Sequence, residues 1–433
     1  MTPTVTGLLS FLVLVGFMFL KIPVGFVMAI VGFTGFGLLV SWDASLSLIA
    51  RDFFSVFSSY NLTVIPLFVL MGQVAHHSGM SGRLFNTAHK FLGHLPGGLA
   101  IATIGACAGF SAICGSTSAT AATMASVALP QMKKYNYDPA LATGVVAAGG
   151  SLGILIPPST IFIIYGIMTE QSIGKLFMAG VLPGILLTLL FVLTIVVWTR
   201  VDPKVCKKAP KATWKERMIS LNGVIETFIL FILVMGGLFA GIFTPTEAAA
   251  IGAFGTLLIA IIGRSLSWKG FLRSLDETTR VSCMIFVIVA GATIFGHFLA
   301  VTGIPTNVGA WVSTLSLPSP VIMGLIILVY LVLGCLMDSL AMIMLTLPVF
   351  FPVVTTLGYD PIWFGVIIVL VTEMGVITPP VGINVYVVSG VARDVPLQTI
   401  FKGASHLLIA LLVTAVLLIL FPQIATYLPG LTK

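Results

Sequence analysis

Two segments decide the fold of this chain: 137–159, YDPALATGVVAAGGSLGILIPPS, and 359–380, YDPIWFGVIIVLVTEMGVITPP. A shift of 222 residues superposes their YDP triplets and their double prolines without a gap. The same shift also matches Pro130 with Pro352, Gly153 with Gly375 and Ile161 with Ile383. Because proline and glycine mark backbone geometry rather than composition, these matches indicate an internal repeat. The chain therefore consists of two related halves, about 1–200 and 222–433.

The composition indicates a membrane protein. Of the 433 residues, 58% are hydrophobic and only 8% are charged, whereas a soluble domain has about 25% charged residues. Such a chain cannot cover itself with a hydrated surface, so its solvent is a bilayer. At about 20 residues per crossing there is room for roughly ten to twelve membrane elements. A soluble enzyme, a disulfide-linked secreted domain and a nucleic-acid reader are excluded, and an all-α integral membrane protein is predicted.

Two apolar stretches do not have the length of simple crossings. Residues 97–132 are too long for one helix, and residues 281–337 contain a helix and more. We interpret 97–132 and about 319–353 as re-entrant helical hairpins that enter from opposite sides. With the N-terminus periplasmic, 18 of the 21 Lys and Arg residues then fall inside, as the positive-inside rule requires. This topology makes the loop 200–217 cytoplasmic and the C-terminus periplasmic.

The predicted topology puts the first YDP inside and the second outside, so the halves are inverted repeats. Repeat 1 (1–200) has scaffold helices over about 1–75, the hairpin at about 97–132, a broken helix over about 139–169 and a helix over 176–199. A basic cytoplasmic linker covers 201–221. Repeat 2 (222–433) has the hairpin at about 319–353, a broken helix over about 361–392 and a last helix over about 403–428. Inverted repeats with broken helices are typical of secondary transporters, whose substrate site lies near the bilayer midplane.

The breaks in the two predicted broken helices carry chemical groups that can bind ions. A double proline stops the helical hydrogen-bond ladder, and the carbonyls it frees must find partners at bilayer depth. Such carbonyls, with Ser and Thr hydroxyls, suit Na⁺, because hard cations prefer oxygen, and the facing half-helix N-termini suit an anion. Small polar residues in membrane helices often serve packing alone, but here they recur at one fixed offset. Asp338, the counterpart of Ser116, is a functional candidate because a membrane carboxylate costs roughly 2.5–3.5 kcal/mol, and Glu373 is the other such carboxylate.

Four segments carry a resemblance to a known family. They are NLTVIPLFVLMGQVAHHSGM (61–80), GFSAICGSTSATAATMA (109–125), the segment 137–159, and TEMGVITPPVGINVYV (372–387). Nearly the whole chain resembles the DctM-like large membrane subunit of tripartite ATP-independent periplasmic (TRAP) transporters. The resemblance implies a Na⁺-coupled symporter of organic acids, of the sialic acid or C4-dicarboxylate class, in the bacterial inner membrane. It also implies two partners, a small four-helix DctQ-like membrane subunit and a DctP-like periplasmic binding protein.

The chain is also similar to Na⁺/dicarboxylate symporters, which implies an elevator-type ion-transporter fold. By resemblance, the first Na⁺ would be bound by Ser111, Gly115, Ser116 and Gly153. The second Na⁺ would be bound by Met337, Asp338, Gly375 and Thr378. The substrate would lie between Thr117, Ser159, Ser339 and Asn384. At least two Na⁺ are expected, since each releases about 2.3 kcal/mol per 100 mV and inward movement of an anion costs about as much as one ion releases.

Two other hypotheses remain at this point. The first is a stand-alone Na⁺- or H⁺-coupled dicarboxylate symporter that needs no binding protein, with a proton carried by Asp338 or Glu373. The second is an intramembrane protease that pairs Ser116 with His297, or Asp338 with Glu373. Ser116 is not in a GxSG setting, and an enzyme gives no reason for an inverted repeat. We therefore predict a transporter and not an enzyme.

Overall fold

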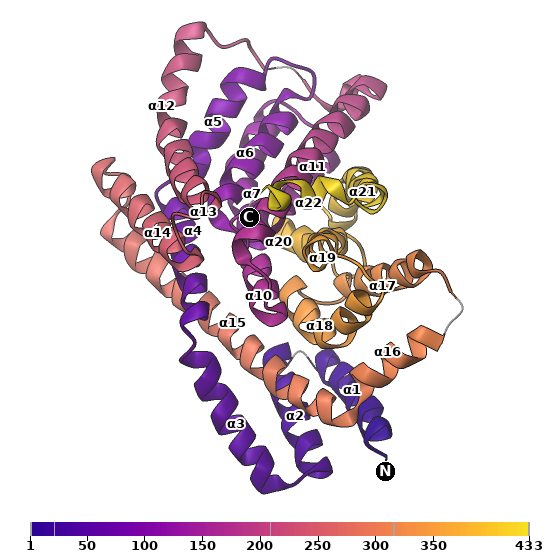
Figure 1. The fold of residues 1–433 in the computed structure, drawn as a ribbon. Helices are drawn as coiled ribbons and strands as arrows, with labels where there is room; N and C mark the ends of the chain where they lie inside the picture. The colour runs from indigo at the N-terminus through magenta and orange to yellow at the C-terminus, as the bar shows by residue number, and fades with distance from the viewer. Residues whose placement is uncertain (1, 21, 208, 315–316, 432–433) are drawn as a thin grey trace.

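The computed structural model describes residues 2–20, 22–207, 209–314 and 317–431, and within these ranges the secondary structure is helical without a strand (Figure 1). Seven of the described helices are long and apolar enough to cross a membrane, or eight spans if the bent pair α3 and α4 counts as one. Five shorter helices are also apolar. The prediction of an all-α membrane protein is confirmed at this level.

The helices of the first half follow the predicted segments. They are α1 (Pro3–Phe19), α2 (Val24–Leu39), α3 (Trp42–Phe57), the short turn η1 (Tyr60–Thr63), α4 (Val64–His77), α5 (Met80–Leu92), α6 (Gly98–Cys114), α7 (Thr117–Lys134), α8 (Pro139–Gly150), α9 (Leu152–Leu155), α10 (Thr160–Thr169), α11 (Ile173–Val201) and the turn η2 (Pro203–Val205). The pair α6 and α7 covers the first predicted hairpin. The series α8, α9 and α10 covers the first predicted broken helix.

The second half begins inside the predicted linker. Its helices are α12 (Trp214–Phe231), the π-helical turn η3 (Ile232–Gly236), α13 (Gly237–Phe239), α14 (Pro245–Ile262), α15 (Trp268–Thr302), α16 (Ile304–Thr314), α17 (Ser319–Gly334), α18 (Ser339–Thr356), α19 (Pro361–Gly375), α20 (Ile383–Val391), α21 (Leu397–Leu420) and α22 (Gln423–Gly430). The pair α17 and α18 covers the second predicted hairpin, and α19 and α20 cover the second broken helix.

Two predicted boundaries differ from the structure. The last predicted helix, 403–428, is two helices, because Pro422 lies between α21 and α22 and its ring cannot continue a helical ladder. The predicted linker 201–221 is helical from Trp214 onward. Its helix α12 starts there because Thr213 and Glu216 form a capping box, in which each side chain accepts the other residue's backbone N–H.

The two YDP motifs act as the same helix start. The Asp138 carboxylate accepts hydrogen bonds from the backbone N–H groups of Ala140 and Leu141, at 2.8 and 3.3 Å, and caps α8. Asp360 caps α19 in the same way, through two bonds of 2.8 Å from Ile362 and Trp363. In both motifs the proline takes the first helical position, where its missing N–H is not needed. The shared triplet is therefore explained by one local structure.

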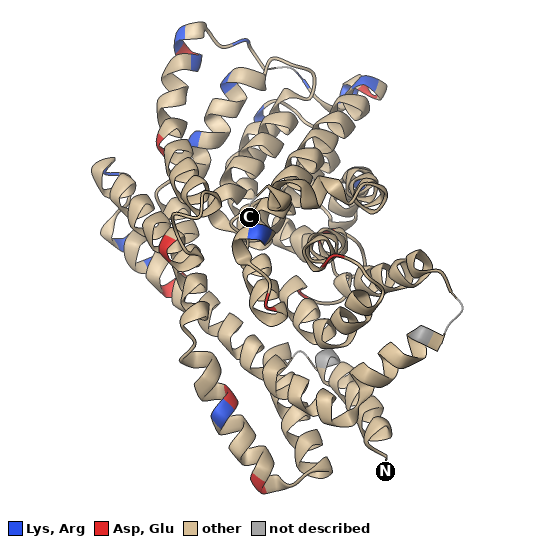
Figure 2. Cartoon of the chain, viewed as in Figure 1, with Lys and Arg blue, Asp and Glu red and all other residues tan. Residues whose placement is uncertain are grey.

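The long helix α15 runs diagonally through the molecule and packs along α2, α3 and α4 (Figure 1). Its closest approach to α2 is through glycines, since a Cβ on Gly291 would lie only 2.0 Å from the carbonyl oxygen of Gly25. Helices α8 and α21 meet similarly, where a Cβ on Gly403 would lie 1.8 Å from the Ala140 carbonyl oxygen. Small residues at helix contacts let membrane helices pack at backbone distance. Lys and Arg gather at helix ends and connections, as at the end of α11 and the start of α12 (Figure 2).

Each hairpin tip is hydrogen-bonded to the double-proline break in the broken helix of its own half. The backbone N–H and the hydroxyl of Thr160 both donate to the Gly115 carbonyl oxygen, at 3.5 and 3.1 Å. In the second half, the Val381 N–H donates to the Cys335 carbonyl oxygen at 3.2 Å. Tip and break therefore form one polar unit in each half of the chain.

Candidate functional site

A cavity of about 270 Å³ lies where the two hairpin tips meet the helices α4, α10 and α15. The first tip contributes Ser116–Ala119, and the second contributes Asp338–Leu340. The opposite wall contains Gly72 and Gln73 of α4 and apolar residues of α15. Most of the polar side chains lining the cavity come from the tips, so the two halves of the chain share one candidate binding site.

The first tip brings the four predicted ligands of the first Na⁺ together. Gly115 ends α6 with a φ of +63°, and its N–H donates to the Ser111 carbonyl oxygen at 3.3 Å. The Ser116 hydroxyl accepts from the Ala119 N–H at 3.4 Å and caps α7. Gly153 lies directly beneath, since a Cβ there would be 2.5 Å from the Ser116 carbonyl oxygen. The Ser111 hydroxyl is buried and has no hydrogen-bond partner among the residues that the structure describes.

The second tip has a different polar group at the corresponding point. The Asp338 carboxylate caps α18 by accepting from the Leu340 N–H at 3.0 Å, and it lines the cavity. Gly375 packs on this hairpin, because a Cβ on it would lie 2.3 Å from the carbonyl carbon of Gly334. Thr378 follows in the break and donates its N–H to the Gly375 carbonyl oxygen at 3.0 Å. Met337, the remaining predicted ligand, is buried beside Asp338.

The four predicted substrate residues separate into two pairs. Thr117 and Ser339 line the cavity. Ser159 and Asn384 are fully buried and are not among the cavity-lining residues. Ser159 instead caps α10, accepting from the Phe162 N–H at 3.4 Å.

Thr117 connects the two halves at the site. Its hydroxyl donates to Glu373 Oε2 at 3.3 Å and accepts from Asn384 Nδ2 at 2.8 Å. The same Asn384 nitrogen donates to the Ala147 carbonyl oxygen at 3.1 Å. All three of these side chains are buried. The first hairpin is thus joined to both parts of the second broken helix, α19 and α20.

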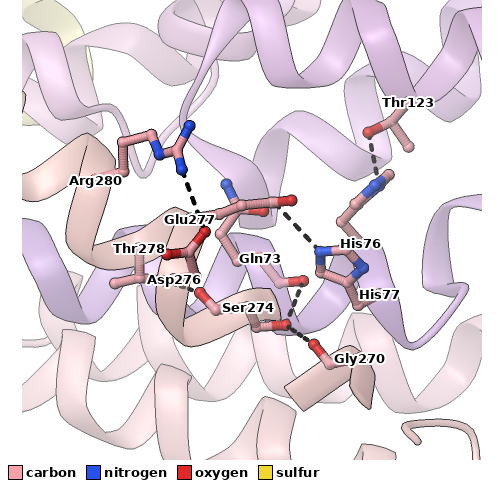
Figure 3. A network of polar contacts seen from close by, with 10 residues as sticks. All are labelled: Gln73, His76, His77, Thr123, Gly270, Ser274, Asp276, Glu277, Thr278 and Arg280. Atoms are coloured by element: carbon pink, nitrogen blue, oxygen red, sulfur yellow. Dashed lines mark hydrogen bonds and ion pairs between the residues drawn. The ribbon is translucent and has the colours of Figure 1, made fainter. Parts of the chain in front are cut away.

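Polar contacts also join the first hairpin to α4, and α4 in turn to α15 (Figure 3). The Thr123 hydroxyl of α7 lies 2.9 Å from His76 Nδ1 of α4. His77 Nε2, next to it, lies 3.2 Å from Glu277 Oε2 of α15. His297 of α15 lies 2.7 Å from Asp52 Oδ2, so it is paired with α3 and not with Ser116.

Sequence reasoning identified Glu373 as a membrane carboxylate but did not find its partner, because Thr117 is 256 residues away along the chain. Two cavity-facing groups were missed as well: Gln73 of α4 and the wall supplied by α15. No local motif marks them. Their relation to the site depends on which helices pack against the hairpins.

Comparisons with known proteins agree with the sequence resemblance. Residues 11–424 match the family model of the tripartite ATP-independent periplasmic transporter, DctM component. The C4-dicarboxylate TRAP transporter large permease protein DctM of Pseudomonas aeruginosa is 37% identical over 394 residues, covering 91% of each chain. The sialic acid TRAP transporter large permease protein SiaM of Vibrio cholerae is 33% identical over 422 residues, covering 96% of each chain.

Among solved structures, the YdaH transporter of Alcanivorax borkumensis has a similar fold. Its TM-score is 0.62 at 16% identity, and the match covers 90% of this chain and 91% of that one. The match to the family model and the identities to its large permeases extend over nearly the whole chain. The chain is therefore a member of the DctM component family of bacterial TRAP transporters, which are multi-pass membrane transporters and not enzymes.

Proposed function

We propose that this chain is the large permease subunit of a Na⁺-coupled symporter that imports a small organic acid. The observation that carries the proposal is the shared cavity, lined by Ser116 and Thr117 of one hairpin tip and by Asp338 and Ser339 of the other. Each tip is bonded to a proline break, where helix ends expose carbonyl oxygens for a cation and N–H groups for a carboxylate.

The proposed ions lie on either side of this cavity. The first Na⁺ is assigned to Ser111, Gly115, Ser116 and Gly153, and the second to Met337, Asp338, Gly375 and Thr378. In the substrate site, Thr117 and Ser339 contact the organic acid, while Ser159 and Asn384 support the cavity wall from behind. Asn384 does so through its hydrogen bond to Thr117.

The proposed movement is an elevator. The two hairpins and two broken helices (α6–α10 and α17–α20) form the moving group, and α1–α4 with α14 and α15 form the scaffold. The cavity lies between these groups, so sliding one along the other would carry the substrate across the membrane. The proposal includes inverted repeats at 1–200 and 222–433, a cytoplasmic linker over 201–221, and both termini in the periplasm.

The proposed partners are a DctQ-like small membrane subunit and a DctP-like periplasmic binding protein. The family name is that of a three-component transporter. Sialic acid and C4-dicarboxylates are the proposed substrate classes, because they appear in the names of large permeases that resemble this chain.

Uptake of labelled organic acids into proteoliposomes tests this function. The vesicles contain the chain and its small subunit, with the binding protein outside and with or without an inward Na⁺ gradient. We expect uptake only when both Na⁺ and the binding protein are present. Uptake driven by a proton gradient alone, or without the binding protein, would support the stand-alone symporter instead.

A further inference from the structure

Glu373 is a buried carboxylate that lacks a cationic partner. Its side chain is fully buried, and none of the ion pairs among the described residues includes it. In the described part of the chain its one hydrogen-bond donor is the neutral Thr117 hydroxyl, which reaches Oε2, while Oε1 is buried and has no partner there. A buried carboxylate that keeps its charge needs a paired charge or a metal ion, and otherwise it takes up a proton. The position therefore calls for a small cation or a proton.

Asn384 contributes a second unpartnered acceptor at the same place. Its amide nitrogen donates to the Ala147 carbonyl, which can only accept, so the orientation of the amide is fixed. The remaining oxygen, Oδ1, is buried and has no donor. Both side chains bond to the Thr117 hydroxyl, so their ends meet at one residue. Next to Thr117, two buried acceptor oxygens thus have no donor among the described residues.

The electrostatic surroundings also favour a cation. Glu373 is two residues before the C-terminal end of α19, the negative end of the helix dipole. Because carboxylate, amide and hydroxyl oxygens are the ligands of hard cations, the chemistry of the set fits a small alkali ion.

We propose that Glu373 Oε1 and Asn384 Oδ1 bind a third Na⁺, between the first hairpin and the second broken helix and separate from the two tip sites. The inference deepens the proposed function, since it takes the same ion. The third ion neutralises Glu373 and fixes the contact between the first hairpin and the second broken helix. Both ligands come from the second half, and both are hydrogen-bonded to Thr117 of the first half, so the site is complete only when the first hairpin packs against α19 and α20.

The test is equilibrium binding of radioactive Na⁺ to the purified full chain in detergent, without substrate. The variant Glu373→Gln keeps the shape of the side chain and removes its charge. We expect three Na⁺ per wild-type chain and two per E373Q chain. The control is Glu226→Gln, which neutralises an exposed carboxylate of α12 and should still bind three.

A second variant, Glu373→Asp, keeps the carboxylate but draws it back by one methylene. It should still bind three Na⁺ per chain, the third at least ten times more weakly than in the wild type, and this result does not depend on E373Q folding well. If wild type and E373Q bind the same number of Na⁺, Glu373 does not bind a third Na⁺. Proton uptake by the wild type but not by E373Q would then show that Glu373 binds a proton instead. A wild type that binds no Na⁺ would instead overturn the sodium coupling itself.

Discussion

A methyl group on Gly153 is expected to damage the first cation site. The added Cβ would lie 2.5 Å from the Ser116 carbonyl oxygen and 2.8 Å from the Thr117 nitrogen. These are backbone atoms that cannot rotate away. An ordinary contact begins at 3.4 Å, so the hairpin tip and α9 must separate by about 0.9 Å. Overpacking of this kind typically costs about 1–3 kcal/mol.

If that cost falls on cation binding, the apparent Na⁺ affinity of Gly153→Ala should decrease by about 5- to 150-fold. The measurement is the Na⁺ concentration that gives half-maximal uptake in proteoliposomes at saturating substrate. The matched control is Gly105→Ala in α6, where an added Cβ meets no atom within 4 Å. G153A with a Na⁺ affinity within twofold of the wild type, while G105A behaves normally, would refute the assignment of Gly153 to the site.

Three further predictions concern single contacts. Removing the cap of α19 with Asp360→Ala should lower the free energy of unfolding by about 1 kcal/mol, measured by thermal unfolding in detergent. Thr117→Val keeps the shape but leaves Glu373 with no donor, which should cost about 1–3 kcal/mol and lower uptake. The Lys133 side chain, through its hydrogen bond to Asp394, holds the pKa of that exposed carboxyl below its usual 3.8, so the contact stabilises the fold above that pH. The stability difference between wild type and Asp394→Asn should therefore shrink as the pH falls from 6 through that range.

Each of these variants has a control in the same chain. Asp43→Ala removes an acidic residue near a helix start that is capped by Ser41, so it should leave stability nearly unchanged. Thr188→Val removes a hydroxyl that bonds only within its own helix, to the Gly184 carbonyl oxygen. Asp276→Asn removes an exposed carboxylate that pairs with Arg280 within α15. A control variant that changes stability or uptake as much as its test variant would contradict the explanation by that contact.

Local signals in the sequence mark most of the places where helices start, break and turn. The YDP triplets fixed two helix starts, because an aspartate cap and a proline in the first turn act within three residues. The double prolines marked both breaks, and the small polar residues around Gly115 and Asp338 marked both tips. These signals are local: each depends on a missing N–H or on a side chain that bonds the neighbouring backbone. Pro422 is of the same kind, and its break was missed because the apolar run continues on both sides of it.

Which of these local features meet depends on how the helices pack in the folded chain. The contacts between Thr117, Glu373 and Asn384 join residues more than 250 positions apart, and no pattern in the sequence pairs them. The approach of Gly153 to the Ser116 backbone likewise depends on how α9 lies beneath the hairpin. Local bonding fixes backbone direction within a few residues. The distance between remote side chains is instead set by the packing of whole helices, which is decided only when the chain is folded.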